Sequence, residues 1–456
     1  MQWIETHLLL IRHALANLFG AKMEHLLKKH LILAHEAKQH FNWDIAEANY
    51  IQAINICPHD YRLYTNLGNT YWLADKPNKA LTMFKKAVAL EPDVALPQLG
   101  LANVLRDLNA FEEAHFVYKQ SCLLANEPIS AWNHSQLLIG LEQYEEAYAM
   151  AEQRLKLTGL NPYRYMPYAT PSSHASLRLI NSDSALFLWS EQGFGDTLQY
   201  LRWLTVLAKQ PNAIVLELEN QLVELVKDGL SWLPHPPMVI SKPPEGTAAP
   251  LINAAQAPLM SLPHYLGGAP LSTTGPYLRN KQWPIKTMPF NLRRIGLVWA
   301  AGRKLDDAFT AREYQKRSLP PAILSSLVTG LHGAGALLTN LQVGHDRELP
   351  PSLTNLFADE LDPDANFAAT AAKICELDLV ITVDTAMAHL CGAIGHNGWV
   401  LLPWSADPRW LRKRSDSPWY PSLQLWRQPS SGDWQAVINK VVEAVKLSFV
   451  RSTEGC

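Results

Sequence analysis

A repeat of 34 residues near the amino terminus constrains the fold of this chain more than any other feature. Positions of the segment 61–94 such as Leu67, Gly68 and Ala80 recur, with residues of similar size, one repeat length earlier and one repeat length later. A helical pair with this period cannot bury its own apolar face, so neighbouring pairs stack into a superhelix. We therefore expect an α-solenoid over residues 1–158.

The repeat resembles the tetratricopeptide (TPR) repeat position by position. Three copies are in register, at 27–60, 61–94 and 95–128, and a degenerate fourth copy covers 129–158. Residues 1–26 are expected to form a capping helix. The resemblance implies a concave groove that holds a polypeptide, because stacked repeats create extended concave surfaces. The alternatives are a rigid spacer or a surface through which the chain forms a homo-oligomer.

The pattern changes after a connector at 159–180 that is rich in Pro and Ser. Short apolar segments then alternate with helical patterns, which indicates parallel sheets with crossover helices. We expect one α/β unit over 181–290 and a second one over 291–450. The strand signals lie at 185–189, 213–219, 237–241, 293–302, 335–342, 378–385 and 399–404.

These strand signals also predict where a ligand would bind. Ligands of open parallel sheets bind beyond the carboxyl ends of the strands. The two units are therefore expected to face each other across a cleft. The loops expected around this cleft follow Trp189, Trp299, Leu341, Val383 and Trp404.

The first motif with chemical content is Glu-Gln-Gly-Phe-Gly-Asp at 191–196, between a predicted strand and a predicted helix. Gly193 and Gly195 allow a tight turn and a close approach of the backbone to a ligand. Asp196 then lies at a helix start, where it could act as a general base toward an acceptor hydroxyl. Aspartate is also a good helix cap, and the local sequence favours that interpretation.

The second motif is Val-Asp-Thr-Ala-Met-Ala-His at 383–389, which again joins a strand to a helix. The backbone N–H groups at such a helix start suit a phosphate, and Thr385 adds a hydroxyl. His389 lies four residues further on, and hence on the same helix face. The alternative, a capped helix with a core histidine, is at least as well supported by the local sequence.

Two further groups of residues are candidates for the cleft. The basic residues Arg303, Lys304, Lys316 and Arg317 follow the fourth strand signal and could neutralise a leaving diphosphate, or form a solvated loop. The segment 404–428 is dense in Trp, Arg and Pro and suits the rim of a cleft. It could equally pack against the sheet.

Composition excludes several classes of protein. The 40 Lys and Arg against 42 Asp and Glu give a net charge of -2, which argues against a protein that binds nucleic acid by bulk charge. The five cysteines show no C-x-x-C spacing, so neither a disulfide framework nor a metal site is expected. With no apolar run long enough to span a membrane and no clear signal peptide, we expect a cytoplasmic protein.

Several motifs occur in one order along the carboxyl-terminal half: EQGFGD, PLMSLP at 258–263, IGLVW, LDLVITVDTAMAHLCGAIG and DSPWYP at 416–421. Together they resemble bacterial TPR-containing glycosyltransferases whose catalytic half is similar to the heptosyltransferase (family 9) group. The resemblance implies a GT-B fold, built from two Rossmann-like domains. It also implies a metal-independent reaction whose donor is a nucleotide sugar, with no separate cofactor.

The same resemblance assigns roles to individual residues. It implies that Asp196 is the catalytic base. It implies that Asp384, Thr385 and His389 bind the diphosphate of the nucleotide sugar, with His389 and Arg317 offsetting its charge. The remaining donor-side positions are Gly193, Gly195 and Gln342.

The expected function is transfer of a sugar to a hydroxyl of a protein held by the repeats. Relatives of this architecture suggest flagellin or another surface protein as the acceptor. One alternative is a glycosyltransferase acting on a lipid or saccharide, with the repeats used for assembly. Another is a non-enzymatic TPR adaptor that retains the GT-B scaffold.

Overall fold

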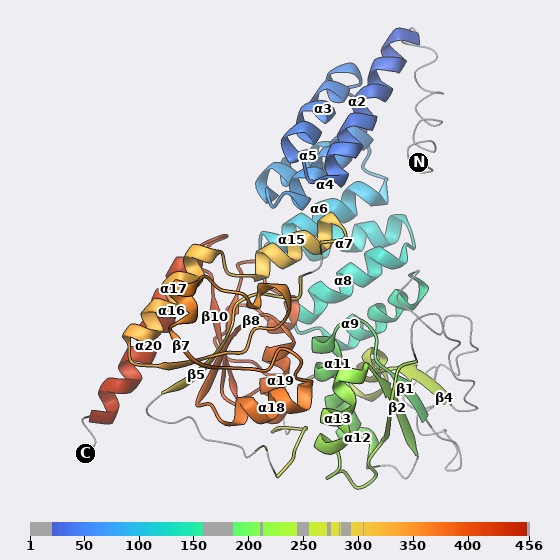
Figure 1. Cartoon of the computed structure of the whole chain (residues 1–456). Helices are drawn as coiled ribbons and strands as arrows, with labels where there is room; N and C mark the ends of the chain where they lie inside the picture. The colour runs from blue at the N-terminus through green and yellow to red at the C-terminus, as the bar shows by residue number, and fades with distance from the viewer. Residues whose placement is uncertain are drawn as a thin grey trace. The chain divides into compact units, whose positions relative to one another are not determined.

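The computed structural model describes residues 21–157, 186–209, 213–243, 255–270, 275–281, 283, 293–303 and 305–453 (Figure 1). The chain divides into two units. The first contains the residues up to Leu137 together with Lys304–Glu313, and the second contains Leu138–Arg303 and Tyr314–Cys456. The predicted connector at 159–180 and residues 1–20 of the predicted capping helix lie outside the described residues.

The first unit is built from antiparallel helical pairs. Its helices are α2 (Ala21–Gln39), α3 (Trp43–Ile56), α4 (Tyr61–Leu73), α5 (Pro77–Leu90), α6 (Ala95–Asp107), α7 (Phe111–Leu124) and most of α8 (Pro128–Gly140). Short turns with a left-handed residue, such as Asp75 and Asn109, close each pair. Helix α2 begins at Ala21, so it runs across the predicted boundary between the capping helix and the first repeat.

The small residues of the repeat allow the helices to approach closely around a large one. Phe84 of α5 is buried between Gly68 of α4 and Gly100 of α6. A Cβ atom at Gly100 would lie 2.1 Å from Cε1 of Phe84, and one at Gly68 would lie 3.0 Å from Cε2. The repeat therefore pairs a large side chain with two small ones, as a stacked helical core requires.

The second unit begins within the fourth predicted repeat. The last residues of α8, then α9 (Tyr144–Ala151) and the 3-10 turn η1 (Glu152–Lys156) belong to it. They precede two α/β lobes. We call the described residues from Leu186 to Trp283 the first lobe, and the described residues 293–303 and 314–453 the second lobe.

The first lobe contains a parallel sheet of order β3-β2-β1-β4. Its strands are β1 (Leu186–Trp189), β2 (Ile214–Leu218), β3 (Met238–Ser241) and β4 (Ala255–Pro258). Its helical elements are α11 (Phe194–Tyr200), η2 (Leu201–Trp203), α12 (Leu204–Leu207), α13 (Asn220–Gly229), η3 (Leu259–Ser261) and α14 (Leu262–Leu266). The strand order reverses between β1 and β4, so the loops that follow these strands form a topological switch point.

The second lobe contains a parallel sheet of order β10-β9-β8-β5-β6-β7. Its strands are β5 (Arg294–Val298), β6 (Leu337–Asn340), β7 (Phe357–Glu360), β8 (Leu379–Val383), β9 (Gly398–Leu402) and β10 (Leu423–Arg427). Read from β5 as the first strand, this is the 3-2-1-4-5-6 order of dinucleotide-binding folds. Its switch point lies between β5 and β8.

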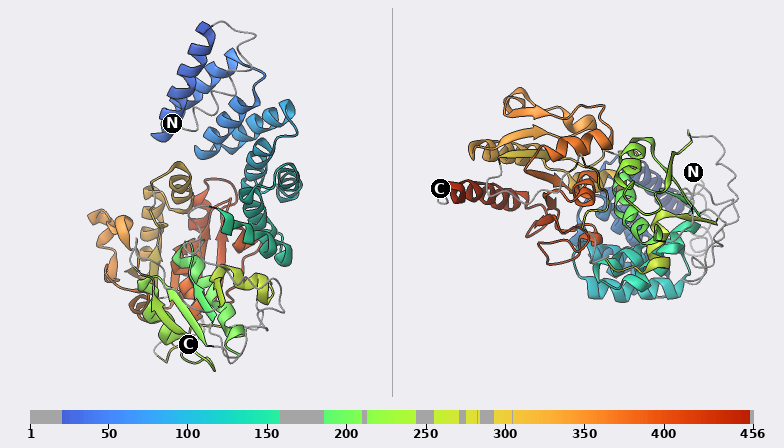
Figure 2. Two further views of the ribbon diagram at one scale, coloured as in Figure 1. Left: turned by 90° about the vertical axis from the view of Figure 1, so that its right-hand side faces the viewer. Right: turned by 90° about the horizontal axis from the view of Figure 1, so that it is seen from below.

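Helices cover the second sheet on both faces, as Figures 1 and 2 show. Buried Leu, Ile and Val side chains of β5, β6 and β8 pack with α16 and α20 in one core. The helical elements are the end of α15 (Ala308–Arg317), whose residues up to Glu313 belong to the first unit, and α16 (Pro321–Gly333), η4 (Gly344–Arg347), α17 (Pro351–Thr354), α18 (Phe367–Cys375), α19 (Ala386–Ile394), η5 (Pro408–Trp410) and α20 (Trp434–Thr453). Among the residues that the structure describes, no helix is long and apolar enough to cross a membrane.

The predicted fold class, helical repeats followed by two parallel α/β units, is confirmed. Four local expectations need correction. Lys316 and Arg317 lie in helix α15 and not in a loop, and strands β4, β7 and β10 had no predicted counterpart. Strand β7 is an exposed edge strand, and β10 lies within the aromatic segment 404–428, so neither shows the continuous apolar run of a buried parallel strand.

We predict that Gly100→Ala destabilises the repeat unit by about 1–3 kcal/mol, because the added methyl group overpacks the site that Phe84 fills. Chemical unfolding measures the loss, and hydrogen exchange of α5 and α6 localises it. Gly333→Ala, where an added Cβ meets nothing within 4 Å, is the control. Adding Phe84→Leu to Gly100→Ala should recover part of the loss, and an equal loss in the double variant would contradict this packing argument.

Candidate functional site

The two predicted motifs meet where the two lobes meet. Helix α11 follows β1, helix α19 follows β8, and the two helices pack against each other. A Cβ atom at Gly195 would lie 2.8 Å from Cδ2 of His389, so only glycine fits at this contact. The carboxyl ends of β1 and β8 are therefore brought together, as the positions of the motifs in their sheets predict.

Asp196 lies at the third position of α11, close to the junction of the lobes. Its Oδ2 accepts a hydrogen bond of 3.2 Å from the backbone N–H of Gly193, so it contributes to capping its own helix. Its Oδ1 lies 2.8 Å from Nη1 of Arg409, and its side chain is 16% exposed. Asp196 thus has a helix-start role and also an ion pair with the opposite lobe.

Arg409 is the site residue that the sequence analysis missed. It lies in η5 of the second lobe, and besides Asp196 it contacts Asp407 at 2.9 Å and donates to Oε1 of Gln199 at 3.0 Å. Asp196 and Gln199 both belong to α11, so this one guanidinium binds two side chains of the first lobe. The sequence offered one indication of this role. Arg409 lies in the loop after Trp404, and that loop was expected to border the cleft.

The charges at the switch point of the second lobe alternate in sign. Burial raises the pKa of Asp384, against the attraction of Arg317. Burial would also raise the pKa of Asp407, but Arg409 lowers it to about 2. Nη1 of Arg317 lies 3.4 Å from the backbone oxygen of Asp384. Two guanidinium groups, the buried carboxyl group of Asp384 and the half-buried one of Asp407 are therefore grouped around the start of α19.

His389 is buried and does not carry the charge expected of it. It is 3% exposed, and its Nδ1 lies 2.8 Å from the hydroxyl of Tyr420. Burial and the nearby Arg409 lower the pKa of His389 well below its usual value, so the imidazole is neutral at pH 7. The neutral imidazole gives no support to the expectation that His389 offsets negative charge, and its role toward a diphosphate stays a prediction. Arg409 lies nearby and is a permanent cation.

Thr385 and Gln342 are occupied by local hydrogen bonds. Thr385 caps α19, its Oγ1 accepting from the N–H of Met387 at 3.2 Å and contacting Oγ1 of Thr382 at 3.1 Å. The amide of Gln342 accepts from the backbone N–H groups of Trp299 and Ala300, both at 3.0 Å. Gln342 therefore shapes the loop after β5, and its role in binding the donor stays a prediction.

The aromatic segment 404–428 joins the two lobes by packing. Trp419 and Tyr420 are buried, and the guanidinium of Arg202 lies over both rings at 5.2 and 4.7 Å. Nη1 of Arg202 also donates to the backbone oxygen of Trp419 at 2.8 Å. These contacts support the packing interpretation of the segment.

A buried ion pair in the second unit holds the first residue of the EQGFGD motif in place. Arg154 of η1 is 0% exposed, and its Nη2 lies 2.5 Å from Oε1 of Glu191, the first residue of the EQGFGD motif. Nη1 of Arg154 contacts Glu152 at 2.8 Å, and Nη2 donates to Oγ of Ser261 at 2.9 Å. Because β1 and β4 precede Glu191 and Ser261, Arg154 links both sides of the first switch point.

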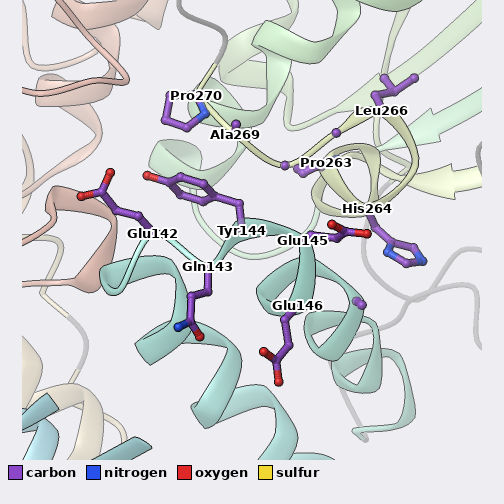
Figure 3. Close-up of a pocket in the computed structure, with 13 residues that line it drawn as sticks. Glu142, Gln143, Tyr144, Glu145, Glu146, Pro263, His264, Leu266, Ala269 and Pro270 are labelled. Carbon is purple, nitrogen blue, oxygen red and sulfur yellow. The ribbon is translucent and has the colours of Figure 1, made fainter. Parts of the chain in front are cut away.

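The remaining basic candidates are spread out. Lys316 lies 3.4 Å from Oγ of Ser405, whereas Lys304 lies outside the described residues. A separate hollow of about 1140 Å³ lies between the start of α9 and residues 263–270 (Figure 3). None of the predicted site residues lines it. Over the part of the chain that the structure describes, no group of three His, Cys, Asp or Glu side chains could hold a metal ion.

We predict that Arg409→Met lowers stability by an amount that depends on pH. In the unaltered protein the low pKa of Asp407 contributes stability above pH 4, which is lost as pH falls through about 2. Without the cation, the pKa of Asp407 is no longer lowered, so this contribution to stability is lost. The deficit relative to the unaltered protein should grow between pH 3 and pH 6, by about 1.4 kcal/mol for each unit of pKa rise.

Urea unfolding at both pH values measures this difference. Arg414→Met, which breaks an exposed pair with Asp416, is the control and should show a much smaller trend, because solvent screens an exposed pair. A deficit of equal size at pH 3 and pH 6 would mean that Arg409 acts through packing alone.

We predict that Arg154→Met costs about 3–5 kcal/mol, because it leaves the Glu191 carboxylate buried without its cation. The double variant Arg154→Met with Glu191→Gln removes both charges and should be more stable than the single variant. Chemical unfolding compares the two with Arg414→Met. A double variant less stable than either single one would contradict the ion-pair explanation.

Comparisons with known proteins support the repeat region. Residues 61–94 match the model of the tetratricopeptide repeat family. Protein FlbA of Caulobacter vibrioides is 28% identical over 160 residues, which is 34% of this chain and 25% of FlbA. The chain therefore spans about a quarter of the length of this curated relative.

Solved structures show only distant similarity. A mutant of the Thermobaculum terrenum O-GlcNAc transferase is 12% identical, with 95% of this chain and 94% of that chain covered and a TM-score of 0.32. MamA is 16% identical, with 29% of this chain and 72% of that chain covered and a TM-score of 0.27. What these comparisons establish is a tetratricopeptide repeat at 61–94.

Proposed function

We propose that this chain is a glycosyltransferase that moves a sugar from a nucleotide-sugar donor to a hydroxyl acceptor. The observation that carries the proposal is the ion pair between Asp196 and Arg409. It joins a carboxylate at the switch point of one parallel sheet to a cation beside the switch point of the other. A nucleophile and a phosphorylated donor would have to meet at such a junction.

The donor is assigned to the second lobe. Its strand order is that of dinucleotide-binding folds, and helix α19 begins at its switch point. A diphosphate at the start of α19 would meet the positive end of the helix dipole. Arg317 and Arg409 would stabilise the negative charge that develops on the leaving diphosphate. Neutral His389 holds the helix in place through Gly195 and Tyr420.

The reaction follows from these assignments. Asp196 takes the proton of the acceptor hydroxyl as the acceptor oxygen bonds to the anomeric carbon. The bond from that carbon to the diphosphate oxygen breaks, and the nucleoside diphosphate leaves with the electron pair. Arg409 pairs with Asp196 across the junction of the lobes. A bound diphosphate would compete for Arg409 and release the carboxylate for this proton transfer.

We assign the acceptor to the class of proteins, flagellin or another surface protein among them, because a tetratricopeptide repeat is present and such repeats form polypeptide-binding surfaces. A lipid or saccharide acceptor is the second candidate. The hollow between α9 and residues 263–270 favours it as a site for the part of such an acceptor that lies away from the reacting hydroxyl. A non-enzymatic adaptor is disfavoured by the buried charges at the junction, which cost free energy and add little net stability.

We predict that Asp196→Asn lowers sugar transfer by about 10²–10⁴-fold, because the amide cannot take the acceptor proton. Transfer is measured with UDP-, GDP-, ADP- and CMP-sugars, and donor binding by the rise in melting temperature, since a ligand that binds only the folded state stabilises it. Donor binding should persist in Asp196→Asn. The exposed Asp416→Asn change is the matched control.

These measurements distinguish a glycosyltransferase with Asp196 as its base from a non-enzymatic adaptor. Full transfer by Asp196→Asn would remove Asp196 as the base. A protein whose melting temperature no nucleotide sugar or nucleoside diphosphate raises would favour the adaptor.

A further inference from the structure

Helix α15 begins inside the repeat unit. Residues up to Glu313 belong to that unit, although they follow β5 in the chain. Nη2 of Arg312 lies 2.6 Å from Oδ2 of Asp107, at the end of α6, and 3.2 Å from Oδ1 of Asp75, just after α4. The side chain of Arg312 is 3% exposed, so the repeats enclose it almost completely.

The enclosure has the composition of a receptor for arginine. The guanidinium of Arg312 lies over the ring of Trp72, 4.9 Å from its centroid. Nε1 of Trp72 donates to Oδ2 of Asp107 at 2.8 Å, which orients the carboxylate toward the guanidinium. We call Trp72, Asp75 and Asp107 the arginine site. An aromatic face and a directed carboxylate are the two groups that distinguish arginine from lysine.

An aromatic residue accompanies the arginine. The ring of Phe309 lies 5.7 Å from that of Trp72, and Phe309 precedes Arg312 by three residues. Residues three apart lie on the same helix face, so both side chains meet the same tryptophan. The repeat unit therefore recognises a helical segment in which an aromatic residue precedes an arginine by three positions.

The attachment of this segment depends on very few side chains. The buried residues of α15 are Ala311 and Arg312, whereas Phe309 is 46% exposed. The segment consequently contributes almost no apolar core to the repeats. A buried ion pair adds little net stability compared with its separated, hydrated state, so another arginine could replace this one at small cost.

We propose that the arginine site is a docking site for a partner protein, and that residues 305–313 occupy it in cis when the partner is absent. The partner presents a helical segment with an aromatic residue three positions before an arginine. Charge complementarity supports this choice, because Asp75 and Asp107 would leave an acidic recess once Arg312 moved out. The proposal concerns binding to the repeats and does not depend on sugar transfer.

The test uses the full chain and a labelled synthetic peptide with the sequence of residues 305–318. Fluorescence anisotropy compares its binding to the unaltered chain and to Arg312→Ala, in which the site is vacated. We expect the vacated variant to bind at least about tenfold more tightly, because the peptide no longer competes with the cis segment. Phe309→Ala, which weakens the cis segment but keeps its arginine, should give an intermediate gain.

Two controls establish that the arginine site is responsible. The same peptide with Arg312→Gln keeps its other charges, including Arg317, and should not bind. Adding Asp107→Asn to Arg312→Ala should abolish the gain in affinity. Hydrogen exchange of α4 and α6 checks that the repeats remain folded in each variant.

Three outcomes would overturn the proposal. Equal affinity for the unaltered chain, Arg312→Ala and Phe309→Ala would show that the segment does not block the site. No binding to Arg312→Ala or Phe309→Ala, with α4 and α6 still protected, would show that the contact is purely structural. Equal binding of the Arg312→Gln peptide would show that the site does not recognise arginine.

Discussion

The close contact between α11 and α19 is the constraint on which the junction of the two lobes depends. Gly195 lets the two helices approach until its backbone meets the ring of His389. His389 is positioned in turn by the hydroxyl of Tyr420, and Tyr420 lies under the guanidinium of Arg202. A side chain at position 195 would separate the helices, and the ion pair between Asp196 and Arg409 would lose its geometry. The geometry of the ion pair between Asp196 and Arg409 thus depends on the packing of Gly195 against His389 and Tyr420.

Four arginines, three of them buried and Arg409 half-buried, perform distinct structural tasks in the described part of this chain. Arg154 holds the glycine loop, Arg202 joins the lobes, Arg409 pairs with α11 and Arg312 fills a recess in the repeats. Each guanidinium has several directed donors, so one side chain can hold two or more backbone segments together. A buried arginine is costly without its partners, and each of these four is matched by carboxylate, carbonyl or aromatic groups. Removing one partner of such an arginine should therefore destabilise every backbone segment that the guanidinium holds together.

Predictions from the sequence succeeded where a periodic pattern of apolar residues follows directly from the geometry of a helix or strand. The repeat period predicted the helical pairs, and the apolar runs at β1, β5 and β8 predicted strands that are buried on both faces. The motifs at 191–196 and 383–389 were placed correctly between a strand and a helix. Predictions failed where the pattern was weak. Helix α15 is mostly polar and buries only Ala311 and Arg312, and the exposed edge strand β7 lacks an apolar face.

The sequence by itself determined the helical array, the two parallel sheets and the positions of Asp196 and Asp384 after their strands, because these depend on periodicity and on chain order. The tertiary structure alone decided which side chains meet. Arg409 is more than two hundred residues away from Asp196 in the chain. Their pairing depends on how two sheets and an aromatic segment pack, which no local pattern records. Burial decided the rest, since it makes His389 neutral and leaves the positive charge to the arginines.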